Sequence, residues 1–166
     1  MGEIDIVSKG VGVKFEGVFS LKGVYRLTDE YFAQFGYDKS EPKSVEAVKK
    51  SGKMVNIILE YSRRLNDYVK AIHKVIIVAD NLTDVDIKKG DARHRMNKGK
   101  LSVEVDTFLE SDYETRWEGK PIYYAARVIW QRYVWAPMGM SFKGETGNIT
   151  NQYAAELKAY LNLGKF

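Results

Sequence analysis

A chain of 166 residues without a single cysteine excludes a disulfide-stapled fold, and it excludes metal sites and nucleophiles that depend on a thiolate. With 45% hydrophobic and 29% charged residues, the composition excludes a disordered or fibrous protein and predicts one globular domain spanning residues 1–166. The formal net charge of +4 is modest, so the distribution of charge along the chain matters more than the total.

The N-terminal segment predicts neither a signal peptide nor a lipid anchor. Positions 3 and 5 are acidic, no long apolar run follows, and Ile6 stands where the myristoylation pattern requires Ser or Thr. The most apolar stretch, from Pro121 to Pro137, contains two arginines and is too short and too polar to span a membrane. We therefore expect a cytoplasmic protein with no membrane partner.

The first forty residues contain one pattern typical of a strand and one typical of a helix. Apolar runs at 4–7 and 11–15 could supply a strand. From residue 21 to 35, apolar side chains recur every three or four positions, as on an amphipathic helix. Ser20 suits the N-cap and Gly36 suits the position after the last turn. We expect a helix over 21–35, although Gly23 weakens it.

Three further strands are predicted by apolar residues at every second position. The alternation covers 55–61, 69–77 and 101–109, and Asn66 with Asp67 favours a tight turn between the first two. Polar residues fill the other face of the third strand. The three segments therefore predict an antiparallel meander with one apolar face, which helices must cover.

The segment before the third strand holds the one dense group of basic residues. Clustered cations gain affinity for phosphates by releasing counterions, so one interpretation is a nucleic-acid or ribosome-binding loop over 88–100. The other is a solvated hairpin loop, which we favour because the segment lacks aromatic residues that stack on bases. The six cations of this segment are Lys88, Lys89, Arg93, Arg95, Lys98 and Lys100.

Residues 121–147 are the hardest part of the chain to interpret. Pro121 suits the first turn of a helix, and apolar residues from 122 to 133 repeat with helical spacing. Alternate positions from 124 to 132 also fit a strand face, and between these we choose a helix over 121–135. Pro137 and three glycines then predict a loop over 136–147.

Aromatic residues and methionines are concentrated in and around this region. Together with arginine, they are the residue types enriched at the centres of protein interfaces. We therefore predict a contact surface within about 117–142. The alternative is that the same side chains fill the core over the sheet. The residues concerned are Trp117, Trp130, Tyr133, Trp135, Met138, Met140 and Phe142.

A long C-terminal helix follows, with Asn148 or Thr150 as its N-cap and Gly164 at its end. Its apolar residues share one face, from Tyr153 to Leu161. The chain as a whole thus predicts an α+β fold. We expect an antiparallel β-meander of three to five strands, packed on one face by an N-terminal helix and this C-terminal helix.

The order of these elements resembles the helix-grip layout of the START and polyketide-cyclase-like superfamily. The resemblance covers most of the chain without a shared motif, and this chain has fewer strands before Pro121 and an extra helix after it. In that superfamily the last helix and the curved sheet enclose an apolar ligand. The resemblance implies a pocket lined by Val69, Ala71, His73, Val75, Leu157 and Leu161.

Catalytic and cofactor signatures are missing from the sequence. His73 falls on the apolar face of a predicted strand, where a core or pocket-lining histidine is favoured over a catalytic base. Two histidines without metal-ligand spacing argue against a transition-metal site, and Asp80, Asp84 and Asp86 lack the spacing of a calcium loop. The phosphate-loop, dinucleotide and serine-nucleophile motifs are absent as well.

These observations favour a non-enzymatic interaction or self-assembly protein that uses the aromatic and methionine-rich segment, with no cofactor and no metal. We expect a homo-oligomer or a protein partner. The alternatives are a carrier of a small hydrophobic ligand and a protein that binds nucleic acid through residues 88–100.

Overall fold

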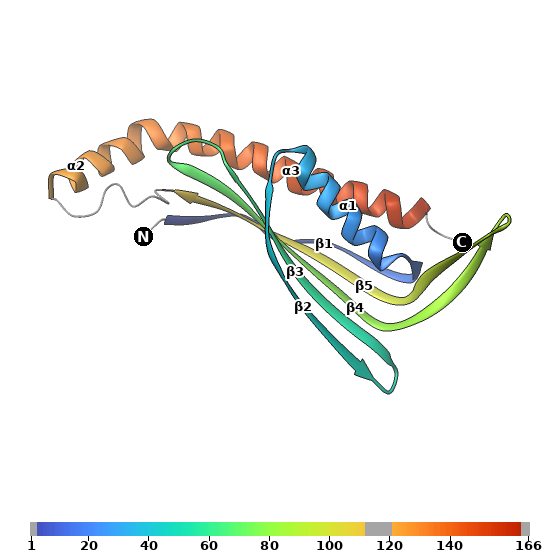
Figure 1. Ribbon diagram of the computed structural model, residues 1–166. Helices are drawn as coiled ribbons and strands as arrows, with labels where there is room; N and C mark the ends of the chain where they lie inside the picture. The colour runs from blue at the N-terminus through green and yellow to red at the C-terminus, as the bar shows by residue number, and fades with distance from the viewer. Residues whose placement is uncertain (1–2, 112–120, 164–166) are drawn as a thin grey trace.

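The computed structural model describes residues 3–111 and 121–163, which form an antiparallel sheet with helices over one face (Figure 1). The strands are β1 (Glu3–Phe19), β2 (Asp38–Lys49), β3 (Gly52–Arg64), β4 (Val69–Lys89) and β5 (Ala92–Ser111). The helices are α1 (Leu21–Gln34), α2 (Pro121–Trp130) and α3 (Ala136–Leu163), with a π-helical turn, η1 (Gln131–Trp135), between the last two. The predicted α+β class is confirmed.

Within the sheet the strand order is β1-β5-β4-β3-β2, and every neighbouring pair is antiparallel. Strands β2 to β5 follow one another as a meander. Helix α1 connects β1 to β2, and these two strands form the opposite edges of the sheet. The three strands predicted from alternation lie within β3, β4 and β5, and the apolar runs at 4–7 and 11–15 both lie in β1.

Strand β2 was not predicted, because its sequence lacks the alternation that marks a half-buried strand. It is an edge strand in which Val45 and Val48 are both exposed, so no buried face imposes a hydrophobic period. Pro42 lies where the register with β3 shifts, and proline is tolerated in sheets at such edge positions.

Strands β4 and β5 extend further than the sequence predicts. The loop expected over 88–100 is wrong for most of that segment, because the two strands stay paired out to Lys89 and Ala92. Gly90 turns the chain between them with φ +65°, a conformation that favours glycine. Many side chains on this hairpin are exposed, which explains why no hydrophobic period marked it as strand.

The core lies between the sheet and the pair α1 and α3, which both cover the same face (Figure 1). Val24 and Phe32 of α1 and Leu157 and Leu161 of α3 are buried against alternate residues of the strands, such as Leu59. Full burial of each such side chain contributes roughly 1.5–3 kcal/mol. Helix α1 begins at the predicted residue, because the Ser20 hydroxyl accepts from the Gly23 amide, and it ends at Gln34, one residue before the predicted end.

Helix α3 overturns two predictions at once. Residues 136–147 are helical instead of a loop, and the helix therefore begins at Ala136 instead of being capped at Asn148 or Thr150. Glycines disfavour helix by about 1 kcal/mol each, but packing against β1 outweighs that preference. A Cβ on Gly147 would lie 3.6 Å from Val7, so the helix approaches this strand closely.

The helix predicted over 121–135 is confirmed as α2 followed by η1. Pro137 has no backbone N–H and cannot donate a hydrogen bond to the preceding helical turn. The π-helical turn η1 ends two residues before it, where the pattern of backbone hydrogen bonds must change. Across 3–111 and 121–163, no helix combines the length and the hydrophobicity that crossing a bilayer requires.

Candidate contact surface

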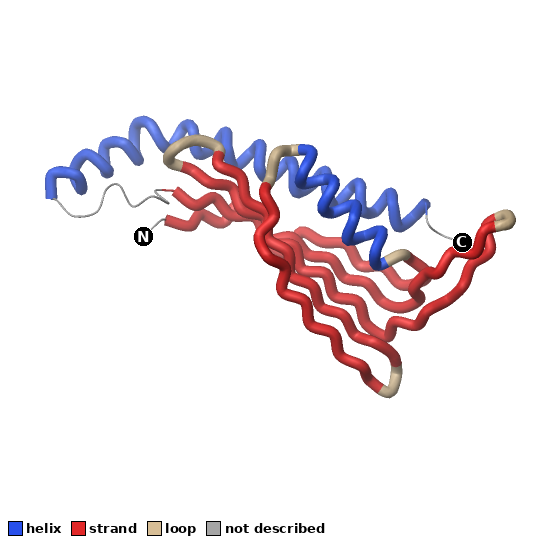
Figure 2. Tube along the Cα trace, viewed as in Figure 1, coloured by secondary structure: helices blue, strands red, loops and turns tan. Residues whose placement is uncertain are grey.

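The chain from 121 to 143 comprises α2, η1 and the first turns of α3, and its α2 end reaches past the ends of the strands (Figures 1 and 2). We name these residues the arm. Its large apolar side chains are exposed to an unusual degree: Tyr133 is 71%, Met140 is 76% and Ile129 is 61% exposed. A helix with apolar residues on most of its sides is normally buried in protein or lipid, so the exposure of these side chains is unusual. The exposed apolar residues are Val128, Ile129, Trp130, Tyr133, Val134, Met138 and Met140.

The residues predicted for contact do not all lie in the same environment. Trp130 is 36% exposed and packs edge-to-face on Tyr68 of the β3–β4 turn, with ring centroids 6.2 Å apart. Phe142 is half-buried and packs against the core, as the alternative interpretation expects. Trp117 and the side chain of Trp135 lie outside the described residues. The exposed part of the predicted surface is thus centred on Trp130, Tyr133 and Met140.

The inner end of the arm is fixed to the edge strand β1. The Lys143 ammonium lies 2.8 Å from the Asp5 carboxylate, and Gly139 is buried beside this contact. Between the two elements is an open hollow of about 410 Å³, lined by Glu3, Asp5, Ser111, Ala136, Gly139, Met140 and Lys143. The arm is therefore an extension of a helix that the fold holds in place.

Charge in the arm is of one sign, which our sequence analysis overlooked. Between Glu118 and Glu145 the sequence has no Asp or Glu, whereas it has Lys120, Arg127, Arg132 and Lys143. Arg132 is exposed in the structure. The arm thus combines apolar and aromatic side chains with positive charge alone, a signal that counting charges by segment can find.

The six residues of the predicted ligand pocket are all buried, but they are spread along the core instead of gathered around one hollow, because His73 lies beside Thr150 whereas Leu161 follows about three helical turns later on α3. The hollows described here are lined by other residues. His73 Nδ1 lies 3.2 Å from the hydroxyls of both Thr107 and Thr150, which are 2.7 Å from each other. Burial lowers the pKa of His73 to about 4, so the ring is neutral at pH 7.

His73 Nε2 is buried and has no hydrogen-bond partner among the described residues. Its ring lies against Phe32, with centroids 5.0 Å apart, and edge-on to Tyr37 at 4.8 Å. A catalytic base must reach a proton on a bound substrate, and this packing keeps the nitrogen away from solvent. The arrangement fits a core histidine better than a base.

Hydrogen bonds from α1 to α3 surround this histidine. Thr28 and Tyr153 share a bond of 2.8 Å, and the Tyr31 hydroxyl donates to the Ile149 carbonyl at 2.7 Å. Burial first, then the neighbouring Glu156, raises the pKa of Tyr31 to about 12, so its hydroxyl remains a donor. Tyr61 donates to Asp29, and burial followed by this bond raises the pKa of Tyr61.

The six cations predicted as a nucleic-acid contact do not form one surface. Alternate residues of paired strands point to opposite faces, so Lys88, Arg93 and Arg95 share a face with Asp84 and Asp86. Arg95 pairs with Asp84 at 2.5 Å. Lys89 lies on the other face, where it lines a small apolar hollow with Ile87, His94 and Met96.

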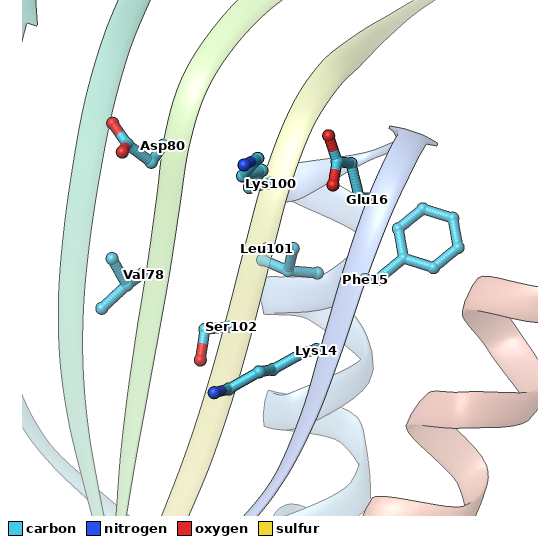
Figure 3. Close-up of a pocket in the computed structure, with 8 residues that line it drawn as sticks. All are labelled: Lys14, Phe15, Glu16, Val78, Asp80, Lys100, Leu101 and Ser102. Atoms are coloured by element: carbon cyan, nitrogen blue, oxygen red, sulfur yellow. The ribbon is translucent and has the colours of Figure 1, made fainter.

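Lys98 and Lys100 lie further along β5, where Lys100 is opposite Glu16 on one side and Asp80 on the other. These three residues and Lys14 line an open hollow of about 420 Å³ on the helix-free face of the sheet, together with Phe15, Val78, Leu101 and Ser102 (Figure 3). Opposite charges facing one another across strands stabilise the pairing. The hollow shows no arrangement of a nucleophile with a base.

No group of three or more metal-ligating side chains occurs within 3–111 and 121–163. The chain matches no protein-family model, and neither the curated proteins nor the solved structures include a significant match to it.

Proposed function

We propose that the protein is a non-enzymatic interaction protein and that the arm is its contact surface. The observation that carries the proposal is the exposure of Ile129, Tyr133 and Met140 on a helix that the fold extends beyond its own sheet. Leaving such side chains in water costs about 25 cal/mol per Å² of apolar surface relative to covering them. A partner that covers the arm recovers this free energy.

The same proposal places the protein in the cytoplasm. The chain has no cysteine, so it gains nothing from an oxidising compartment. Under this function the arm is covered by a second copy of the chain or by a different partner. Its chemistry is recognition, with no catalytic residue assigned.

Oxidation of methionine in cells that express the protein tests the proposal. Met140 is exposed on the arm, and half-buried Met96 on the β4–β5 hairpin serves as a reference within the same molecule. We expect the ratio of Met140 to Met96 oxidation by peroxide to be several-fold lower in intact cells than in dilute purified protein. An equal ratio in both samples contradicts a covered arm.

Light scattering across a concentration series identifies one partner directly. A particle mass that rises above the 19.0 kDa of one chain indicates self-assembly. The arm variant Trp130→Ser/Tyr133→Ser/Met140→Ser tests whether the arm is responsible. Its matched control, Val45→Ser/Val48→Ser, removes exposed apolar side chains from the edge strand β2 instead.

Carriage of a small apolar ligand, which the helix-grip resemblance implies, is a second candidate. It is favoured by His73 Nε2, a buried nitrogen without a partner among the described residues, because a polar atom of a ligand could satisfy it. Native mass spectrometry of freshly purified protein tests this function. A species heavier than the bare chain, lost on denaturation, supports it, and the mass of the bare chain alone contradicts it.

A further inference from the structure

The arm has the composition of a helix that lies in a membrane interface. Such helices combine Trp and aliphatic residues with Arg and Lys, and Trp and Tyr are enriched at the level of the lipid headgroups. Trp130, Tyr133 and Arg132 are all exposed on the arm. The sequence predicted no membrane partner because it contains no membrane-spanning segment. A helix that lies along the membrane interface does not require a spanning segment.

Charge distinguishes between the possible partners. Two copies of the arm packed together would bring positive charge against positive charge, because the sequence between Glu118 and Glu145 has no carboxylate to offset its basic residues. An anionic lipid surface attracts these cations instead. It also covers exposed apolar and aromatic side chains on the face of a helix that lies against it.

From this combination we infer that the arm binds the surface of an anionic lipid bilayer, with its exposed aromatic and aliphatic side chains among the headgroups and Arg132 at the lipid phosphates. The inference rests on the proposed function, because it names the partner of the same surface. The start of α2 extends past the ends of the strands (Figure 2). The cytoplasmic leaflet carries the negative potential that this arm suits.

Flotation with lipid vesicles tests the inference on the full chain. One set of vesicles contains phosphatidylcholine alone, and the other contains phosphatidylcholine mixed with phosphatidylglycerol. We expect the protein to float with the anionic vesicles and to remain unbound with the neutral ones. We also expect the variant Trp130→Ser/Tyr133→Ser/Met140→Ser to bind about tenfold or more weakly, because it loses three interfacial side chains.

Two charge reversals form a matched pair. Arg132→Glu and Arg93→Glu each change the net charge equally, one on the arm and one at the tip of the β4–β5 hairpin. Each cation near an anionic surface strengthens binding roughly fivefold, so Arg132→Glu should weaken it by about tenfold or more. Arg93→Glu should leave it unchanged within about twofold. Circular dichroism of each variant checks that the fold is retained.

Three results overturn the inference: no binding to anionic vesicles at low salt, equal binding to neutral vesicles, or loss of binding in Arg93→Glu but not in Arg132→Glu. Self-assembly that depends on the arm, without binding to either vesicle, also overturns it while leaving the proposed function intact. Equal oxidation of Met140 in cells and in dilute solution rejects the proposed function itself.

Discussion

At the scale of single residues, the protonation state of His73 depends strongly on its surroundings. It is fully buried between Phe32, Tyr37 and the hydroxyls of Thr107 and Thr150. Burial disfavours the charged ring, which lowers its pKa from 6.5 to about 4. In the unfolded chain, where the ordinary pKa applies, the same ring takes up a proton more readily.

This difference makes the stability of the fold depend on pH. The unfolded state binds the proton more tightly, so the contribution of His73 is complete above pH 6.5 and is lost as the pH falls towards 4. We expect a loss of about 2 kcal/mol from this residue between neutral pH and about pH 5. Urea denaturation of the wild type and of His73→Leu at both pH values measures it. If the pH dependence of the two proteins is the same, His73 is accessible to protons in the fold.

At the scale of elements, α3 shows how packing can outweigh local preference. Its first half contains Gly139, Gly144 and Gly147, yet it is helical because it packs along β1 and is fixed by the ion pair of Lys143 with Asp5. The glycines differ in their surroundings. A Cβ on Gly144 would meet nothing within 4 Å, whereas one on Gly12 of β1 would lie 2.5 Å from the Val103 carbonyl oxygen.

Alanine at these two positions should therefore have opposite effects. Gly144→Ala should raise the free energy of unfolding by about 0.5–1 kcal/mol, because alanine favours helix and loses less backbone entropy on folding. Gly12→Ala should lower it, because β1 must shift away from β5 to admit the methyl group. Chemical denaturation of both variants measures the two changes. A destabilised Gly144→Ala would mean that the first half of α3 is not helical in solution.

The pairing of α1 with α3 depends in part on the buried hydrogen bond between Thr28 and Tyr153. A double-mutant cycle with Thr28→Val and Tyr153→Phe isolates this bond, because neither change alters the shape of the side chain much. We expect a coupling free energy of about 0.5–1.5 kcal/mol in denaturation experiments. Additive effects would show that the two hydroxyls do not interact.

At the scale of the whole molecule, the proposed contact surface is separate from the buried residues that stabilise the fold. Trp130, Tyr133 and Met140 lie outside the core, whereas Leu157 is fully buried in it. Exposed substitutions usually change stability by no more than about 0.5 kcal/mol each, and loss of a buried leucine costs about 2–5 kcal/mol.

Thermal denaturation should show this separation. The triple serine variant of the arm should melt within a few degrees of the wild type, whereas Leu157→Ala should melt far lower. An arm variant that melts as low as Leu157→Ala would show that the arm belongs to the core. The experiment also establishes that lost binding in the arm variant does not come from unfolding.

The sequence predicted correctly those parts of the fold in which burial of one face gives the apolar residues a regular spacing. The strands of Leu59, Val75 and Val105 each have one buried face, so their alternation is visible in the sequence, as is the helical spacing of α1. It missed β2 and the distal β4–β5 hairpin, where exposed side chains carry no period. It misread the first half of α3, because contacts with β1 far away in the sequence determine that helix.

The segment predicted as a contact surface does expose apolar side chains, but its secondary structure was predicted partly wrongly. Met138 and Met140 are exposed, but on a helix instead of a loop, and Phe142 packs inward. The basic residues of 88–100 form one group along the chain. Strand pairing, however, divides them between the two faces of the sheet and places aspartates beside some of them. Neither effect is visible before the register of the strands is known.

Because α3 continues without a break from Ala136 to Leu163, it is a rod about 40 Å long, with one end in the arm and the other against the sheet. Whatever holds the arm therefore also restrains the core residue Thr150, one of the two threonines that contact His73. Attachment at one end should slow amide hydrogen exchange at the other, so that residues 149–157 report on an event at the far tip of the molecule.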